Sequence, residues 1–356
     1  MLQNLNVADY LKWTEKNHWF EKRFQILANQ FFDYICGPLS DVINPGKDII
    51  DNVSNVMEKC NIIDFNNENV AIAYAMMHFL DRYHRAIISF KYLIEQEVFP
   101  SYRKYLDILD VGTGPGSYLY AVSDIYLSIK EFTKFTNSPY MNGKIITIDY
   151  VEKGEGFRSF LNSFTQKLNA WATENDIPTW SVPYSHGSFY DFLDIKFNIK
   201  KIRFLQKYRY NLISMSNFLT LEENITTYES QIYNSLKNLR NNGSLVIIGS
   251  SSKAYESLYA KLIETINNMH FSNKRFSAYV SSRKESTLES NFTDSMGIIK
   301  KDYFKKLQSY LIKNNYFLSD YFKNLLDEIC DQDYMKANSW KLLVFQKHSK
   351  FRKKNS

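Results

Sequence analysis

Cysteine is scarce in this chain, and long apolar runs are missing. The three cysteines, Cys36, Cys60 and Cys330, lie far apart and form no C-x-x-C pair, so the sequence encodes neither a disulfide framework nor a zinc site. No apolar run reaches the length of a membrane span, and the first residues lack the basic and apolar regions of a signal peptide. We therefore expect no metal, no contact with a membrane and a cytoplasmic location.

Outside its last ten residues the chain also has almost no net positive charge. The formal net charge is +6, but five positive charges fall in the last ten residues: Lys347, Lys350, Arg352, Lys353 and Lys354. The rest of the chain is then close to neutral at +1, and residues 348–356 are expected to form a basic, solubilising tail. The 356 residues are 44% hydrophobic and 16% aromatic, enough for a packed core in a catalytic domain with an additional module.

An apolar stretch followed by a glycine turn is the most informative part of the sequence. Leu106 to Val111 is typical of a buried parallel strand, glycines occupy positions 112, 114 and 116, and a helical pattern follows at once. Glycine removes the side chains that would keep a ligand from the backbone, and the start of a helix offers free N–H groups. The spacing is G-x-G-x-G, whereas the dinucleotide fingerprint has its third glycine one residue later. The pattern predicts a nucleotide-binding turn.

From Asp110 to Gly116 the chain resembles the class I S-adenosylmethionine (SAM)-dependent methyltransferases, whose first motif is a strand that ends in acidic-x-G-x-G-x-G. The resemblance covers about residues 102–346 and implies SAM as cofactor. It also implies an α/β fold with a seven-stranded, Rossmann-like methyltransferase sheet. The residues that would hold the amino-acid end of SAM are Asp110, Gly112, Thr113, Gly114, Pro115 and Gly116.

Three later segments complete the cofactor site that the resemblance implies. Asp149 ends the apolar stretch 144–149 and would accept the ribose hydroxyls, and Tyr150 would pack on the adenine. The region 187–191 would contact the adenine ring through Ser188 or Phe189, although many relatives carry an acid where Ser188 stands. An apolar stretch begins at Tyr210. The residues at its end would lie beside the transferable methyl group: Ser214, Met215, Ser216 and Asn217.

Two histidines are candidate general bases, His84 and His186. His84 lies on a predicted helix just before the first strand, where its neighbours Arg82 or Tyr83 could instead contact the carboxylate of the cofactor. A single histidine on a helix is more often a core or surface residue, so a structural role for His84 remains open.

The first hundred residues carry apolar side chains at helical spacing, over 7–35 and 69–98, with little strand signal. We interpret residues 1–100 as a helical module and 101–347 as the SAM-binding domain. In relatives such a module covers the cofactor crevice or forms a homodimer, and a bundle that only buries apolar area is the alternative. Further along, 271–296 is polar and predicts an insertion or a mobile loop, and 316–321 predicts a sixth strand.

The residues after the stretch at 210 limit the choice of methyl acceptor. No D/N/S-P-P-Y/F signature and no cysteine stand there, which argues against methylation of the amino groups or of C5 in nucleic-acid bases. An oxygen or nitrogen of a small molecule or peptide remains. RNA is an alternative acceptor, because residues 196–209 carry six basic side chains and no acid, although such a stretch is also typical of a solvated connector. A non-catalytic binding module on the same fold is the third interpretation.

Overall fold

A computed structural model describes residues 5–36, 46–59, 63–99, 105–141, 145–182, 210–272, 276–290, 294–316, 318–331 and 338–351. Within these residues the strands form one seven-stranded sheet in the order β2-β1-β3-β4-β7-β6-β5. Their bounds are β1 Tyr105–Val111, β2 Ile145–Val151, β3 Tyr210–Ser216, β4 Leu239–Ser250, β5 His270–Ser272, β6 Phe276–Ser290 and β7 Asn338–Phe351.

One half of the sheet, β2-β1-β3-β4, is parallel, and in the other half neighbouring strands are antiparallel. β1 pairs in parallel with β2 and β3, and β3 with β4, whereas β7 is antiparallel to both β4 and β6. Parallel strands need crossover connections, which put helices on the faces of the sheet. The predicted α/β class and the seven-stranded sheet are confirmed.

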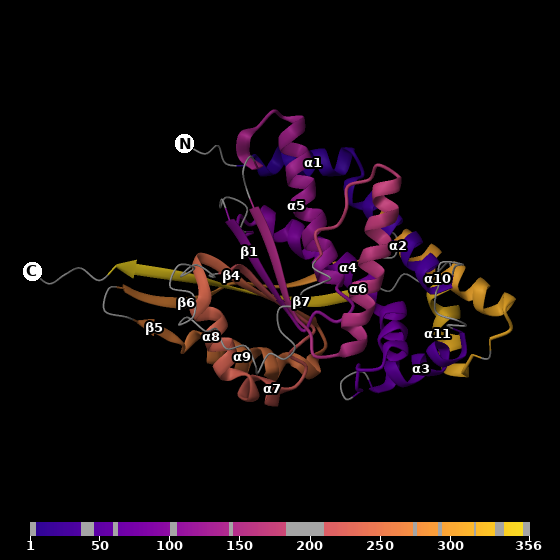
Figure 1. Cartoon of the computed structure of the whole chain (residues 1–356). Helices are drawn as coiled ribbons and strands as arrows, with labels where there is room; N and C mark the ends of the chain where they lie inside the picture. Colours follow the sequence, from indigo (N-terminus) through magenta and orange to yellow (C-terminus); the bar gives the residue numbers. More distant parts are fainter. Residues whose placement is uncertain are drawn as a thin grey trace, which may run out of the picture.

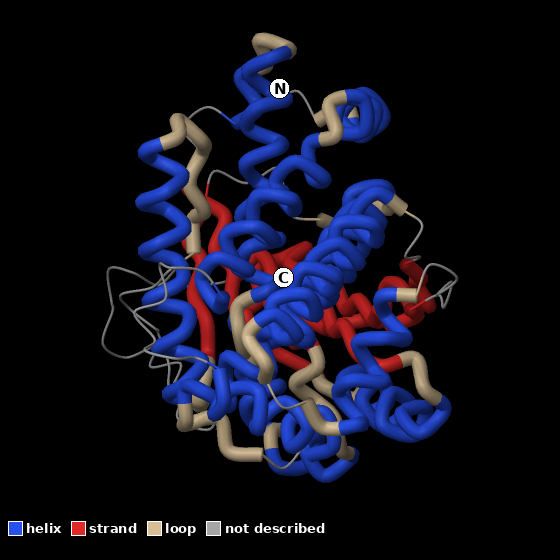
Figure 2. The backbone as a smooth tube through the Cα atoms, turned by 90° about the vertical axis from the view of Figure 1, so that its right-hand side faces the viewer, coloured by secondary structure: helices blue, strands red, loops and turns tan. Residues whose placement is uncertain are grey.

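Helices cover both faces of the sheet, as Figures 1 and 2 show. One face packs against α5 (Ser117–Phe135) and α6 (Glu155–Glu174), together with helices from both ends of the chain. The other face packs against α7 (Glu222–Thr227), α8 (Glu229–Asn238) and α9 (Glu256–Asn267). Two separate apolar cores result, one on each side of the strands.

The N-terminal helices belong to the first of these cores. They are α1 (Val7–Lys16), α2 (Trp19–Cys36), α3 (Gly46–Lys59) and α4 (Glu68–Glu95). Asn6 and Asn67 cap α1 and α4 by accepting backbone N–H groups, as short polar side chains commonly do. The predicted helical character of this part is confirmed. Because its apolar residues share one buried cluster with α5, α6 and the sheet, the division of the chain at residue 100 stays a prediction.

Two predicted segments near the C-terminus were wrong. Residues 276–290 form the long strand β6, whose pairing with β7 spans both strands almost end to end; its polar composition hid it, because the ladder rather than apolar burial holds it. The described residues of the segment 316–321 form no strand: α10 (Ser295–Lys313) ends before them and α11 (Asp320–Cys330) begins within them, capped by Ser319. Short apolar runs do not distinguish helix from strand.

The predicted basic tail begins inside β7, which continues to Phe351. Just before it, Lys347 is buried, and its ammonium group donates to the carbonyl oxygens of Leu236, Lys237 and Leu239 at 3.0, 2.5 and 2.8 Å. These carbonyls belong to the C-terminal end of α8, where helices leave acceptors without partners. The side chain of Lys347 therefore caps the C-terminal end of α8. Residues 352–356 lie outside the described part of the chain.

Among the helices of the described residues, we find none that combines the length and the apolar character needed to cross a membrane.

Candidate functional site

The glycine turn connects β1 to α5 and is left-handed at all three glycines. The φ angles of Gly112, Gly114 and Gly116 are +69°, +55° and +83°, which side chains with a Cβ rarely adopt. A Cβ at Gly112 would collide with the ring of Phe218, and one at Gly116 with Leu161 of α6. At Gly114 a Cβ would meet nothing within 4 Å. Two glycines therefore allow close packing, and Gly114 borders open space.

The carboxyl group of Asp110 connects the turn to β3 through hydrogen bonds. Its Oδ1 accepts a hydrogen bond from Ser214 Oγ at 2.6 Å, and its Oδ2 accepts one from Thr113 Oγ1 at 2.9 Å. The side chain is buried, and burial raises the pKa of Asp110 to about 7. Asp110 thus joins β1, the turn and β3, and acts as a positioning residue for the predicted cofactor site.

A buried acid that sequence reasoning missed lies against the turn. Glu152 directly follows β2, and its carboxylate accepts the N–H groups of Gly114 at 2.6 Å and Gly154 at 2.8 Å. Burial raises its pKa. The N–H of Lys153 also donates to this carboxylate. A carboxylate offers about four lone-pair sites, so these three donors still leave some capacity for a ligand. The sequence alone did not single it out, because Asp149 and Glu152 both follow apolar residues.

Asp149 and Tyr150 lie inside β2, which ends at Val151, two residues later than predicted. Asp149 pairs with Leu109, and its Oδ2 accepts the hydroxyl of Tyr210 at 3.1 Å. Tyr150 is 2% exposed and belongs to the core under α5 and α6. The structure therefore brings Glu152, rather than these two residues, to the glycine turn.

The C-terminal end of β3 and the residues just after it reach the same turn. Ser214 and Met215 are buried, and Ser216 and Asn217 are partly exposed. Asn217 has a φ of +52°, and its backbone N–H donates to the carbonyl of Ile248 at 2.7 Å. The next side chain, Phe218, covers Gly112. These contacts bring the segment to the turn, and its position beside the transferable methyl group stays a prediction.

Tyr83 and His84 point elsewhere. The hydroxyl of Tyr83 donates to Asp124 at 2.6 Å, and its ring stacks on Phe24. Asp124 lies seven residues into α5, about 10 Å from its start at 1.5 Å per residue. His84 Nε2 lies 3.2 Å from Asp294 at the start of α10. Neither side chain is brought to the glycine turn, and these contacts give their predicted roles no support.

Several predicted residues lie outside the described part of the chain: His186, Ser188, Phe189 and the basic stretch 196–209. Their roles stay predictions.

The N-terminal part approaches the turn through the segment just before α4. The N–H of Gly156 donates to the carbonyl of Phe65 at 3.0 Å, and the N–H of Glu155 donates to Asn66 Oδ1 at 3.2 Å. Phe65 also packs on Gly154, which binds Glu152. Residues 63–67 therefore form one edge of the region around the turn.

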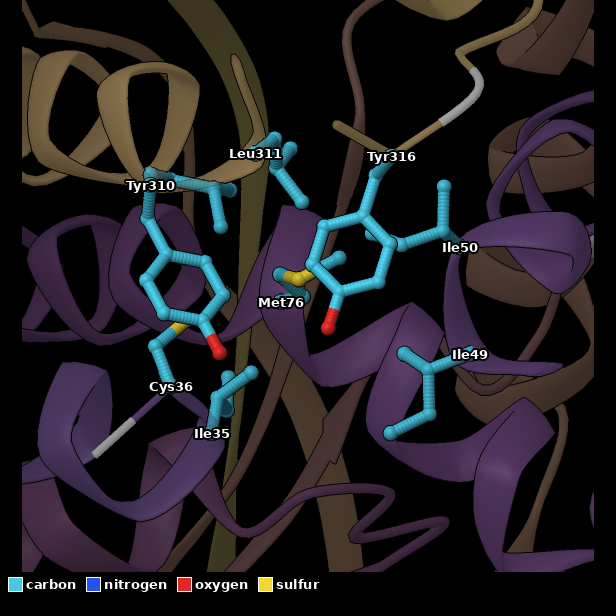
Figure 3. A pocket seen from close by; sticks show the side chains of 9 residues that line it. Ile35, Cys36, Ile49, Ile50, Met76, Tyr310, Leu311 and Tyr316 are labelled. Atoms are coloured by element: carbon cyan, nitrogen blue, oxygen red, sulfur yellow. The ribbon is translucent and has the colours of Figure 1, made fainter. Parts of the chain in front are cut away.

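A small apolar hollow between α2, α3, α4 and α10 is not part of this site (Figure 3). It is lined by Cys36, Met76, Tyr310 and Tyr316 with neighbouring aliphatic residues, and its volume of about 10 Å³ holds at most about one water. Burial raises the pKa of Cys36 to about 12, so the thiol stays protonated and is no nucleophile.

Comparison with known proteins gives matches among solved structures alone. No family model matches the chain, and no curated protein matches it. Coclaurine N-methyltransferase bound to N-methylheliamine and S-adenosylhomocysteine (SAH) is 9% identical with a TM-score of 0.37, covering 92% of this chain and 98% of that one. Phosphoethanolamine N-methyltransferase 2 of Haemonchus contortus, in complex with phosphomonomethylethanolamine and SAH, is 10% identical with a TM-score of 0.35, covering 80% and 60%.

Precorrin-6y C5,15-methyltransferase of Geobacter metallireducens is 8% identical with a TM-score of 0.31, covering 71% of this chain and 86% of that one. All three of these proteins are methyltransferases. At such low identities and TM-scores the functional assignment of this protein depends on its own turn, sheet and acids.

Proposed function

We propose that this protein is a SAM-dependent methyltransferase that acts on an oxygen or nitrogen of a small molecule or peptide. The observation that carries the proposal is the turn at Gly114, where a left-handed glycine borders open space and donates its N–H to a buried carboxylate at the end of the neighbouring strand. Ligands of open α/β sheets bind at this edge, outside the carboxyl ends of the strands.

SAM fits the groups around the turn. Glu152 would accept a ribose hydroxyl with the lone-pair capacity that the N–H groups of Gly114, Lys153 and Gly154 leave, and would replace Asp149 in this role. Gly116 brings no side chain to cap α5, so the first N–H groups of that helix would serve the carboxylate of the amino-acid end. Residues 216–218 would border the methyl group.

SAM would supply an activated methyl group, and the chain would supply its placement. Holding an acceptor and a methyl carbon in line can provide much of the rate of a group transfer. The contacts of Phe65 and Asn66 with the start of α6 support a covering role for the segment before α4. A homodimer through the N-terminal helices has no comparable support, and neither has an RNA acceptor.

The assignment of the ribose acid is tested by a matched pair of variants, Glu152→Gln and Asp149→Asn, titrated with SAM and SAH by calorimetry. Loss of a charged acceptor weakens binding by about 10- to 100-fold, so Glu152→Gln should lose affinity to that extent and Asp149→Asn should bind nearly as the unmodified protein does. The reverse order would return the role to Asp149.

The open space above the turn is tested by Gly114→Asn. Asparagine tolerates a left-handed φ better than other residues with a Cβ, so the fold should persist while its side chain fills the space and abolishes SAM binding. Thermal unfolding reports the fold and calorimetry reports the binding. If the unmodified protein shows neither heat nor a thermal shift with millimolar SAM, the proposed function is refuted.

A further inference from the structure

Three side chains on one face of α4 lie next to the region around the glycine turn. Tyr74, His78 and Arg82 stand four residues apart, so they follow one another along one side of the helix; we call them the α4 face. The ring of Tyr74 packs edge-on against that of Phe65, with 5.1 Å between the ring centroids. Phe65 in turn packs on Gly154 beside the turn. The α4 face therefore begins at the edge of the proposed cofactor site.

The guanidinium group of Arg82 lacks an anionic partner. Its central carbon lies 4.8 Å from the centre of the Tyr74 ring, a cation–π contact that holds the side chain in place. Within the described part of the chain Arg82 forms no hydrogen bond and no ion pair. The other arginines whose side chains the structure describes each contact a carboxylate or backbone carbonyl groups: Arg23, Arg85, Arg158 and Arg240. Arg82 is thus set apart as a group that can receive an anion.

The ring of His78 lies beside the same tyrosine, with 4.7 Å between the centroids of the His78 and Tyr74 rings. Burial and the charge of Arg82 lower the pKa of His78 to about 3, so the ring is neutral and has one donor and one acceptor nitrogen. These nitrogens have no hydrogen-bond partner among the described residues. His78 and Arg82 are both partly exposed, and none of their nitrogen atoms is among the fully buried polar atoms without a partner. A ligand can therefore reach them.

Positive charge exceeds negative charge along this side of α4. The acid next to Arg82 in the chain is Asp81, and its carboxylate is shared by Arg85 at 2.7 Å and by the ammonium group of Lys300 at 3.1 Å. Two cations already surround this single negative charge, so Asp81 does not neutralise Arg82 as well. Arginine pairs with carboxylates and phosphates through two parallel N–H···O bonds, and either group would balance the charge here.

We propose that the α4 face binds the methyl acceptor, and that the acceptor is a small organic molecule with a carboxylate or phosphate group. The inference rests on the proposed function, because it places the acceptor beside the SAM site. Arg82 pairs with the anionic group of the acceptor, and His78 accepts a hydrogen bond from its hydroxyl or amino group. The ring of Tyr74 provides an apolar wall between these two contacts.

The proposal is tested by ligand-observed NMR titration of the full chain, saturated with SAH, with 4-hydroxybenzoate and with phenyl phosphate. The neutral control is 4-hydroxybenzamide, which is close in shape to 4-hydroxybenzoate. We expect at least one of the two acids to bind about tenfold more tightly than the amide, and the tighter acid identifies the anionic group. Binding of neither acid more tightly than the amide, or displacement of SAH by the acids, would overturn the proposal.

Variants locate the anion. Arg82→Gln should weaken binding of the tighter acid by about tenfold and leave the affinity for SAH unchanged, and Arg82→Lys, which keeps the charge, should lose less. Lys237→Gln removes an exposed charge on α8, on the other face of the sheet, and should change neither affinity. Thermal unfolding checks that each variant is folded. A loss of SAH affinity in Arg82→Gln would assign this arginine to the carboxylate of the cofactor and refute the acceptor site.

The histidine provides a second measurement. In histidine-labelled protein, assigned with His78→Gln, the ring-nitrogen signals of His78 should shift when the acid binds, and unchanged signals would refute the site. The acids are also titrated without SAH, so that failure of the cofactor site and failure of the α4 face give different results. Absence of SAM and SAH binding refutes the proposed function, whereas SAH binding without preference for an acid refutes the acceptor site alone.

Discussion

The buried carboxyl group of Asp110 should make the stability of the protein fall as the pH rises from about 4 to 7. Burial raises the pKa of Asp110 from 3.8 to about 7, so in this range the folded state holds a proton that the unfolded state releases. Folding then loses about 1.4 kcal/mol per pH unit from this group, and about 4 kcal/mol once the pH exceeds 8. Below pH 4 both states are protonated and the loss disappears.

Asp110→Asn removes this titration and keeps the shape of the side chain. The hydroxyls of Thr113 and Ser214 can rotate to meet an amide, so the fold should be retained. From the two pKa values, the variant should gain about 2.5 kcal/mol in free energy of unfolding relative to the unmodified protein between pH 5 and pH 8. Urea unfolding at both pH values measures this difference.

The exposed residue Asp302 provides the control, because Asp302→Asn makes the same substitution outside the core. A difference between Asp110→Asn and the unmodified protein that does not change with pH would refute the reasoning. That outcome would mean that Asp110 is ionised in the folded protein throughout this range.

Three further variants test contacts that hold the fold. Asp124→Ala leaves the buried Arg23 guanidinium without its carboxylate partner at 2.7 Å and should cost about 3–5 kcal/mol of unfolding free energy; a loss below about 1 kcal/mol would contradict the buried pair. Lys347→Met removes the closure of α8 and should lower stability by about 1–3 kcal/mol in urea unfolding, whereas unchanged stability would show that water satisfies those carbonyls. Gly116→Ala meets Leu161 and an unfavourable φ, so it should lower the melting temperature, and Leu161→Ala should not restore it fully because the φ strain remains.

The glycine turn could be predicted from sequence because its determinants are local. Three glycines at alternate positions, an apolar strand before them and a helical pattern after them lie within a few dozen residues, and each feature restricts the backbone by itself. Asp110 could be singled out for the same reason. The hydrogen bond by which Asp110 connects the turn to β3 could not be predicted. Ser214 is more than a hundred residues away, and the contact depends on the pairing of β1 with β3.

The acid that lies against the glycine turn, Glu152, could not be identified from the sequence alone. Asp149 and Glu152 stand three residues apart, and both follow apolar residues. Only the register of β2 against β1, with Val151 opposite Val111, shows that the strand continues past Asp149 and delivers Glu152 to the turn.

The two acids at the turn make cofactor binding and proton release interdependent. Asp110 and Glu152 are both buried, both have raised pKa values, and the charge of Glu152 adds to the rise at Asp110. A positive charge nearby lowers the pKa of an acid, and SAM carries a sulfonium charge that SAH lacks. If SAM binds here, it should release a fraction of a proton near pH 7, and SAH should release less. Calorimetry in two buffers of different ionisation enthalpy measures the protons released, and Asp110→Asn should remove most of the difference between the two ligands. Equal release by SAM and SAH would show that the sulfonium lies too far from Asp110 and Glu152 to affect them, which would place the methyl group away from the turn.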